Sequence, residues 1–305
     1  MKPGAKCQLV IDSCSDLPYE MVKAMDVIEI HFPYIMSDGT HYDDFWQSMS
    51  QDEFFERVDA GELPTTAQVP VPVLTETFEK IAQSGIPTVY ISFTSGLSGT
   101  FDTLLTVLDD IHAKYPDSEI YAVDTVGASI VEALLDVEAV KRRDAGWTAK
   151  EIADWVEENK WFVHGFFTLE SLESLKRGGR IPASIATIGD KIDVKPILTF
   201  DLEGHLVSYK MVRGRKKSLK ELNRIFEEKM VPGPGEDKPT IWYSHGRALE
   251  DLHTLEDMNK QVRDHDSIDC LVDAELAVHV GSGFVAECFW GPDRRLEAKG
   301  KRGSS

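Results

Sequence analysis

The segment Thr88-Val89-Tyr90-Ile91-Ser92-Phe93, continued by Thr94-Ser95-Gly96-Leu97-Ser98-Gly99-Thr100, decides the fold class of this chain. Its first part is an apolar, β-rich run, as expected of a buried parallel strand. Its second part is a polar loop, after which apolar residues recur at helical spacing from Phe101 to Ile111, so we expect a helix there. This order of strand, polar loop and helix indicates an α/β fold, in which ligands bind at loops beyond the strand ends.

Strand-like and helix-like segments alternate on both sides of this segment. Apolar runs predict further strands at residues 7–11, 27–32 and 119–123. Amphipathic patterns and capping boxes predict helices that begin near residues 18, 50, 71, 128 and 148. The alternation indicates an N-terminal α/β domain with a mainly parallel sheet flanked by helices.

The composition changes at Trp161, and we expect a domain boundary near Asn159. Strand-like runs follow at residues 161–168 and 194–200, and a turn leads from the second into another run at 205–212, which predicts a β-hairpin. The second domain should therefore be α+β, with a mixed or antiparallel sheet. The expected organisation is an N-terminal domain at residues 1–159, a second domain at 160–295 and a disordered tail at 296–305.

Composition excludes several classes of function. The chain has 305 residues, of which 42% are hydrophobic, and is long enough for two cores. Its formal net charge of −19 disfavours nucleic acid, which normally needs a basic surface. No apolar run could span a bilayer and no export signal is recognisable, so we expect a cytoplasmic protein. The four cysteines lack the spacing of a zinc site, and nucleotide-hydrolysis and metal-catalysis motifs are missing, so we expect no metal or other cofactor.

Two polar loops offer hydrogen-bond donors to an anion. The hydroxyls and glycines of residues 94–100 precede a helix, whose N-terminus attracts negative charge. Thr65 and Thr66 lie in a second loop, before another helix, and could form the opposite wall of the same pocket. Ordinary helix caps would explain the same residues, so neither loop decides the question alone.

His279 and two basic clusters are further candidates. His279 is expected at the end of an apolar strand, beside Gly281 and Gly283, which permit close backbone approach. A single histidine in such a place is more often part of the core. The clusters at residues 177–180 and 213–217 are basic in an acidic protein, which suits an acidic partner and, equally, a solvated loop.

Several segments, taken together and in order, resemble the motifs of the DegV family. Each is weak alone, but their joint spacing, within a match from about residue 7 to residue 290, is specific. The segments are Asp12-Ser13-Cys14-Ser15-Asp16, Thr65-Thr66-Ala67-Gln68, Thr94-Ser95-Gly96-Leu97-Ser98-Gly99-Thr100, Asp124-Thr125, Leu175-Lys176-Arg177-Gly178-Gly179-Arg180-Ile181, Lys195-Pro196-Ile197-Leu198 and His279-Val280-Gly281-Ser282-Gly283.

The resemblance implies two α/β domains that hold a long-chain fatty acid in an apolar tunnel between them. In many bacteria, proteins of this family are the acyl-binding subunit of fatty acid kinase, which phosphorylates the bound carboxylate for phospholipid synthesis. The implied partners are a fatty acid and the kinase's catalytic subunit, with no integral membrane contact, possible transient exchange at a membrane surface, and no catalysis by this chain itself. By position, the resemblance implies carboxylate contacts at Thr65, Thr66, Ser95, Ser98 and His279, pocket positions at Gly96, Gly281, Ser282 and Phe284, and kinase docking at Arg180 and Arg213.

Burial of the acyl chain of such a ligand favours binding, whereas removing its carboxylate from water opposes binding. About fifteen methylenes, at about 0.8 kcal/mol each, offer on the order of 12 kcal/mol before the costs of ordering and association. The carboxylate needs hydrogen-bond donors to replace its hydration, and uncharged donors leave it reactive, so we expect Arg180 and Arg213 at the rim of the site.

Two alternative functions remain: a hydrolase that uses Ser95 or Ser98 with His279 as base, and a lipid sensor that acts through a protein partner.

Overall fold

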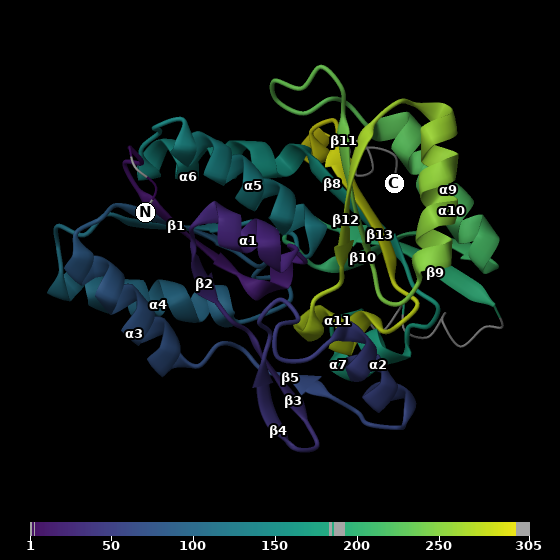
Figure 1. Ribbon diagram of the computed structural model, residues 1–305, viewed down its shortest axis with the longest axis horizontal. Coiled ribbons are helices and arrows are strands. Elements are labelled where there is room, and N and C mark those ends of the chain that lie inside the picture. The colour runs from purple at the N-terminus through teal and green to yellow at the C-terminus, as the bar shows by residue number, and fades with distance from the viewer. Residues whose placement is uncertain (1, 3, 183–184, 186–192, 297–305) are drawn as a thin grey trace.

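The computed structural model describes residues 2, 4–182, 185 and 193–296, and within these residues the chain forms three β-sheets (Figure 1). The first sheet is entirely parallel, and its strands follow the buried apolar runs of the first half of the sequence. In spatial order these strands are β2 (Ile28–Ile30), β1 (Gln8–Asp12), β6 (Thr88–Ser92) and β7 (Ile120–Asp124). The predicted parallel sheet is thus confirmed, with strand ends within two residues of those expected.

Helices flank this parallel sheet, as the alternation predicts. Figure 1 shows α3 and α4 on one side of it and α5 and α6 on the other. The Thr148/Glu151 capping box opens α6 with both of its reciprocal hydrogen bonds, and Ser50 caps α2 through Glu53 N. The helices of this half are α1 (Tyr19–Met25), α2 (Gln51–Asp59), α3 (Val71–Ser84), α4 (Thr100–Lys114), α5 (Ile130–Asp144) and α6 (Ala149–Asn159).

A small antiparallel sheet was not predicted. It consists of β4 (Gly39–Tyr42), β3 (Pro33–Met36) and β5 (Thr65–Thr66), in that order. The sequence pattern placed Thr65 and Thr66 in a loop, but they pair with Ile35 and Tyr34 of β3. A strand of two residues has no periodicity of its own, so only its pairing partner reveals it.

The third sheet is mixed, as expected for the second half of the chain. Its strands, in spatial order, are β10 (Leu206–Arg213), β9 (Val194–Phe200), β8 (Val163–Thr168), β13 (Val285–Trp290), β11 (Thr240–His245) and β12 (Asp266–Leu271). Only β11 and β12 run parallel, and β9 and β10 form the predicted hairpin. Two helices, α9 (Arg215–Lys229) and α10 (Leu249–Val262), pack against one face through a separate apolar cluster.

His279 lies in a helix, so its prediction as the end of a strand was wrong. The helix α11 (Ala274–Val280) begins at Asp273, whose Oδ1 accepts a hydrogen bond from Leu276 N at 2.8 Å. It ends at Gly281, which has a φ of 73°. Every residue of α11 is buried, so neither helical nor strand periodicity is visible, and the Asp273 cap was the only local signal.

One helix joins the parallel and mixed sheets into a continuous core. The helix α5 contacts strands of both sheets, and a single cluster of buried apolar residues extends from Cys7 to Trp290. The buried carboxylate of Asp16 adds a polar link, because it accepts hydrogen bonds from Ser129, from Ser244 Oγ at 2.6 Å and from Asp273 N at 2.9 Å. The expected tail at residues 296–305 lies outside the described residues, except for Leu296, which is exposed.

Candidate ligand-binding site

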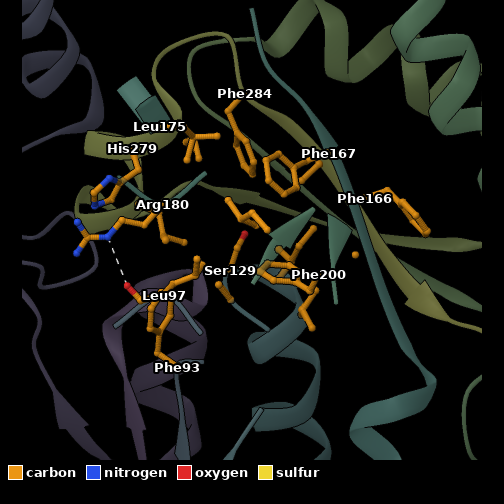
Figure 2. A pocket seen from close by; sticks show the side chains of 18 of the residues that line it. Phe93, Leu97, Ser129, Phe166, Phe167, Leu175, Arg180, Phe200, His279 and Phe284 are labelled. Carbon is orange, nitrogen blue, oxygen red and sulfur yellow. Dashed lines mark hydrogen bonds between the residues drawn. The ribbon is translucent and has the colours of Figure 1, made fainter. Parts of the chain in front are cut away.

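An apolar cavity lies beside the loop that follows β6 (Figure 2); its empty volume is about 620 Å³ when the space open to solvent is included. Residues of both halves of the chain line it, including the loop after β6, the start of α5, the strands β8, β9, β10 and β13, and the helices α7 (Glu173–Gly178) and α11. The cavity therefore depends on how the parallel and mixed sheets pack together.

Aromatic and aliphatic side chains form most of the wall. Figure 2 shows Phe93, Phe167, Phe200 and Phe284 around the cavity; Phe166 is also one of the lining residues, but its ring points away. The rings of Phe167 and Phe284 lie 5.5 Å apart. Because the backbone of β8 alternates its side chains between two faces, Phe167 faces this cavity and Phe166 faces the cluster under α9 and α10. Such a wall suits a hydrocarbon chain.

One end of the cavity is polar. His279, on α11, lines it, and its Nε2 lies 2.9 Å from Thr66 Oγ1 on β5. His279 Nδ1 has no hydrogen-bond partner among the described residues. A Cβ at Gly178 would lie 2.2 Å from this nitrogen, so glycine is what allows α7 to pack so closely on α11. With its proton on Nε2, the imidazole donates to Thr66, whose own O–H is then free to donate onward.

Glu275 brings a carboxyl group to the same polar end. It lies one turn before His279 on α11, and its Oε1 is 4.0 Å from His279 Nε2. Burial raises the pKa of Glu275 to about 8, and the charges of Asp43 and Asp12 act in the same direction, whereas Arg180 opposes them. Burial, with Arg180, lowers the pKa of His279 to about 4. Both side chains are therefore uncharged at neutral pH.

Arg180 supplies the positive charge at this end. It lines the cavity, where its Nε donates to Leu97 O at 3.4 Å (Figure 2). Its guanidinium also donates to Gly178 O. A second, more open hollow shares Arg180 and Leu97 with the cavity. Arg180 thus stands where the two spaces adjoin, whereas Arg213, at the end of β10, is exposed and lines neither of them.

The residues predicted in the loop after β6 make other contacts. Ser95 Oγ donates to Asp124 Oδ2 at 2.5 Å. Ser98 Oγ lies 3.0 Å from Thr100 Oγ1 and accepts from Thr100 N, the first residue of α4. A Cβ at Gly96 would lie 2.4 Å from the backbone of Gly204, which makes this glycine a packing requirement against the β9–β10 turn. In this structure, neither serine is hydrogen-bonded to His279.

The remaining predicted residues are divided between the cavity and the surface. Phe284 is buried and lines the cavity. Gly281 ends α11, and Ser282, which follows it, is exposed. Thr65 is also exposed, because neighbouring strand residues point to opposite faces and Thr66 takes the inner one. The structure therefore brings Thr66, His279 and Phe284 to the cavity region and leaves Thr65 and Ser282 outside.

Glu275 is one of the polar lining residues that sequence reasoning missed, along with Ser129 and Glu287. A helical interpretation of residues 274–280 would have placed it on the same face as His279, since side chains four residues apart are neighbours on a helix. The signal was Asp273, a residue type favoured at helix N-caps. Predicting a strand put residues 275 and 279 on one side of a longer, extended segment, with no contact between them.

An α/β fold that encloses an apolar cavity with a hydrogen-bonding end defines a protein that binds a small amphipathic molecule. The described residues contain no cluster suited to a metal ion, and no helix among them has the length and apolar character needed to cross a membrane. Residues 6–290 match the family model described as "Uncharacterised protein, DegV family". A DegV domain-containing protein of Clostridium perfringens is 34% identical over 289 residues, which cover 94% of this chain and 98% of that one. The chain belongs to the DegV family, as its motifs indicate.

Several solved structures share the fold of this chain. A fatty acid binding DegV family protein of Streptococcus agalactiae has a TM-score of 0.81 and 25% identity, covering 93% of this chain and 98% of that chain. A stearic acid-binding protein of Eubacterium ventriosum has a TM-score of 0.78 and 21% identity, with the same coverage of 93% and 98%. Fatty acids are thus the ligands named for these relatives.

Proposed function

We propose that this protein carries one long-chain fatty acid, with the acyl chain in the apolar cavity and the carboxylate at the end formed by Thr66 and His279. The observation that carries the proposal is the cavity itself: a mainly apolar wall with a polar end, where Thr66 and His279 are hydrogen-bonded to each other and Arg180 adds a positive charge. Burying the chain contributes about 0.8 kcal/mol per methylene, and the donors offset the desolvation of the head group. The relatives that bind fatty acids support the same assignment.

We further propose that the cavity is a tunnel between two domains, with the boundary near Asn159, and that the protein works in the cytoplasm. Lining residues from both halves of the chain support the first point. All four cysteines are buried and unpaired, which suits a reducing compartment.

The acyl chain would be held for a separate enzyme. We propose that a fatty acid kinase phosphorylates the bound carboxylate, and that Arg213 and the outer side of Arg180 dock that kinase. In support, Arg213 is exposed, and Arg180 borders the open hollow beside the cavity. Arg180 is the cation at this end of the cavity, and its guanidinium already donates to Leu97 O and Gly178 O. With an uncharged Thr66 hydroxyl as its donor, the carboxylate would keep its nucleophilicity. A lipid sensor would share the cavity but would not need the carboxylate to react.

The hydrolase alternative lacks its essential contact in this structure. It requires a serine within hydrogen-bond reach of His279, but Ser95 donates to Asp124 and Ser98 pairs with Thr100. His279 Nε2 is taken by Thr66. The geometry therefore favours carriage over ester hydrolysis.

Extraction of ligand from the purified protein tests the carrier function. Mass spectrometry after denaturation should detect about one equivalent of a long-chain fatty acid. Thr66→Val, which removes a head-group donor, should weaken binding of added palmitate by about 10- to 100-fold, the usual effect of losing a hydrogen bond to a charged group. Thr65→Val, on the outer face of the same strand, is the matched control and should bind as the wild type does. A stripped wild-type protein that binds no palmitate would exclude the proposal.

Reconstitution with a fatty acid kinase catalytic subunit and labelled ATP tests the second step. Acyl-phosphate should form only when both proteins and palmitate are present. Arg213→Glu should slow its formation without changing palmitate affinity. Arg295→Glu, at another exposed arginine, is the control for charge alone. Equal rates for both variants would place the docking surface elsewhere.

A further inference from the structure

Glu275 places a third polar group at the head-group end, beside the two already assigned to the ligand. Its side chain is 7% exposed, and it lines the cavity. Cys14 Sγ lies 3.9 Å from Glu275 Oε2, and Thr66 lies beside the same carboxyl. A carboxylate ligand seated on Thr66 and His279 would therefore meet another carboxyl group.

Groups from several segments face this carboxyl. They are Asp12 at the end of β1, Cys14 in the turn after it, Asp43 after β4, Thr66 on β5, Arg180 after α7 and His279 on α11. Burial also raises the pKa of Asp43, to about 6, so Asp43 is charged above neutral pH and opposes ionisation of Glu275. Arg180 is the only cation in this set. Near neutral pH, Glu275 therefore keeps a proton that it can donate.

We propose that Glu275 is a head-group contact, whose carboxyl O–H donates a hydrogen bond to the ligand's carboxylate. This inference rests on the proposed carrier function. A neutral carboxyl has one donor, so Glu275 can donate to the ligand's carboxylate while Thr66, which accepts from His279, donates its own O–H to the same carboxylate. Two carboxyl groups in contact resist ionising together, and sharing one proton removes their repulsion.

The binding of a fatty acid anion then depends on the protonation of Glu275. Below the Glu275 pKa of about 8, the Glu275 carboxyl is protonated and its O–H can donate a hydrogen bond to the ligand. Above it, the ligand must either bring a proton with it or meet a second negative charge. Affinity for a fatty acid anion should therefore fall by about ten-fold for each pH unit above this pKa, whereas an uncharged ester of the same acid should bind with little pH dependence.

Calorimetric titration of stripped protein with palmitate, at several pH values above neutrality, measures this dependence. The wild type should show the ten-fold loss per pH unit. Glu275→Gln keeps a donor but has no proton to lose, so its affinity should change by less than about two-fold over the same interval. Palmitate methyl ester should show no such loss with the wild type.

Glu287→Gln is the matched control. Glu287 is another fully buried glutamate whose pKa burial raises to about 8. Its Oε2 accepts from Asn259 Nδ2 at 3.0 Å, on the face of the mixed sheet that packs against α10. Glu287 is among the residues that line the cavity, but its carboxyl is bonded to Asn259 on the other face of the sheet. Its variant should therefore retain the wild-type pH dependence.

A second measurement needs no variant. Carbon NMR of carboxyl-labelled palmitate bound to the wild type should show a step in chemical shift as Glu275 ionises, at a pH above about 8. The same pH dependence of affinity in Glu275→Gln and the wild type, or a bound carboxyl signal without a step, would refute the role of Glu275 while leaving the carrier function intact. If the wild type binds palmitate at no pH, both proposals fail together.

Discussion

Replacing Glu287 by glutamine should make the folded state more stable at alkaline pH. Glu287 lies on β13 with an exposed fraction of 0%, and its Oε1 has no partner among the described residues. Burial raises its pKa from the ordinary 4.5 to about 8. In the unfolded chain the same group loses its proton near the ordinary value.

The magnitude follows from these two pKa values. The folded protein binds this proton more tightly than the unfolded chain, so stability is present at low pH and is lost as the pH rises from about 4.5 to about 8. At about 1.36 kcal/mol for each pKa unit, the loss amounts to about 5 kcal/mol. Glutamine cannot ionise, so this component disappears in the variant. At low pH, an unpaired amide N–H costs the variant about 1–3 kcal/mol.

Urea unfolding, followed by the fluorescence of the tryptophans, measures the difference at about pH 5 and about pH 8.5. We expect Glu287→Gln to be equal to or less stable than the wild type at the lower pH, and more stable by several kcal/mol at the higher one. Glu227→Gln, on the exposed face of α9, is the control. Its free energy of unfolding should differ from that of the wild type by the same amount at both pH values. If the difference between Glu287→Gln and the wild type is the same at both pH values, Glu287 does not hold a proton in the folded protein.

Three further predictions concern packing and access to the cavity. Gly96→Ala should destabilise the protein by about 1–3 kcal/mol in urea unfolding, because its Cβ would meet backbone atoms at 2.4 Å. Gly99→Ala, which meets only the flexible end of Gln68, should cost less; equal losses would contradict this reasoning. Cys14 is buried, which raises its thiol pKa, so mass spectrometry should find it unmodified by iodoacetamide in the native protein and modified in urea. Ala286→Phe should fill the cavity and abolish co-purification of fatty acid, with the far-UV circular dichroism unchanged; retained ligand would place the acyl chain elsewhere.

Much of the fold could be predicted from local sequence. The strands at the centre of both large sheets are apolar runs, and the helices between them show clear periodicity or local caps, such as Thr148 with Glu151. Such signals depend only on residues that are close together in the sequence. They can therefore be recognised without knowing which other segment each helix or strand packs against. Strand β5 and helix α11 were missed or mistaken because the first has two residues and the second is buried on every side.

The candidate site was only partly predictable for a related reason. The motifs selected Thr66 and His279, and these two do meet, although they are 213 residues apart in the chain. The same motifs selected Ser95, whose hydroxyl instead bonds Asp124, and did not select Glu275. A motif identifies which residues are polar and where they stand in the chain, but not which partner each side chain reaches.

The amino-acid sequence by itself determined the α/β class, the parallel and mixed sheets and the family motifs, because apolar periodicity and helix caps act over a few residues. Only the tertiary structure decided that α5 joins the two sheets, that an apolar cavity opens beside them, and that Glu275, Thr66 and His279 share its polar end. The physical reason is that burial and hydrogen-bond partners, which set the charge of Glu275 and His279, arise from segments that meet only when the whole chain has packed.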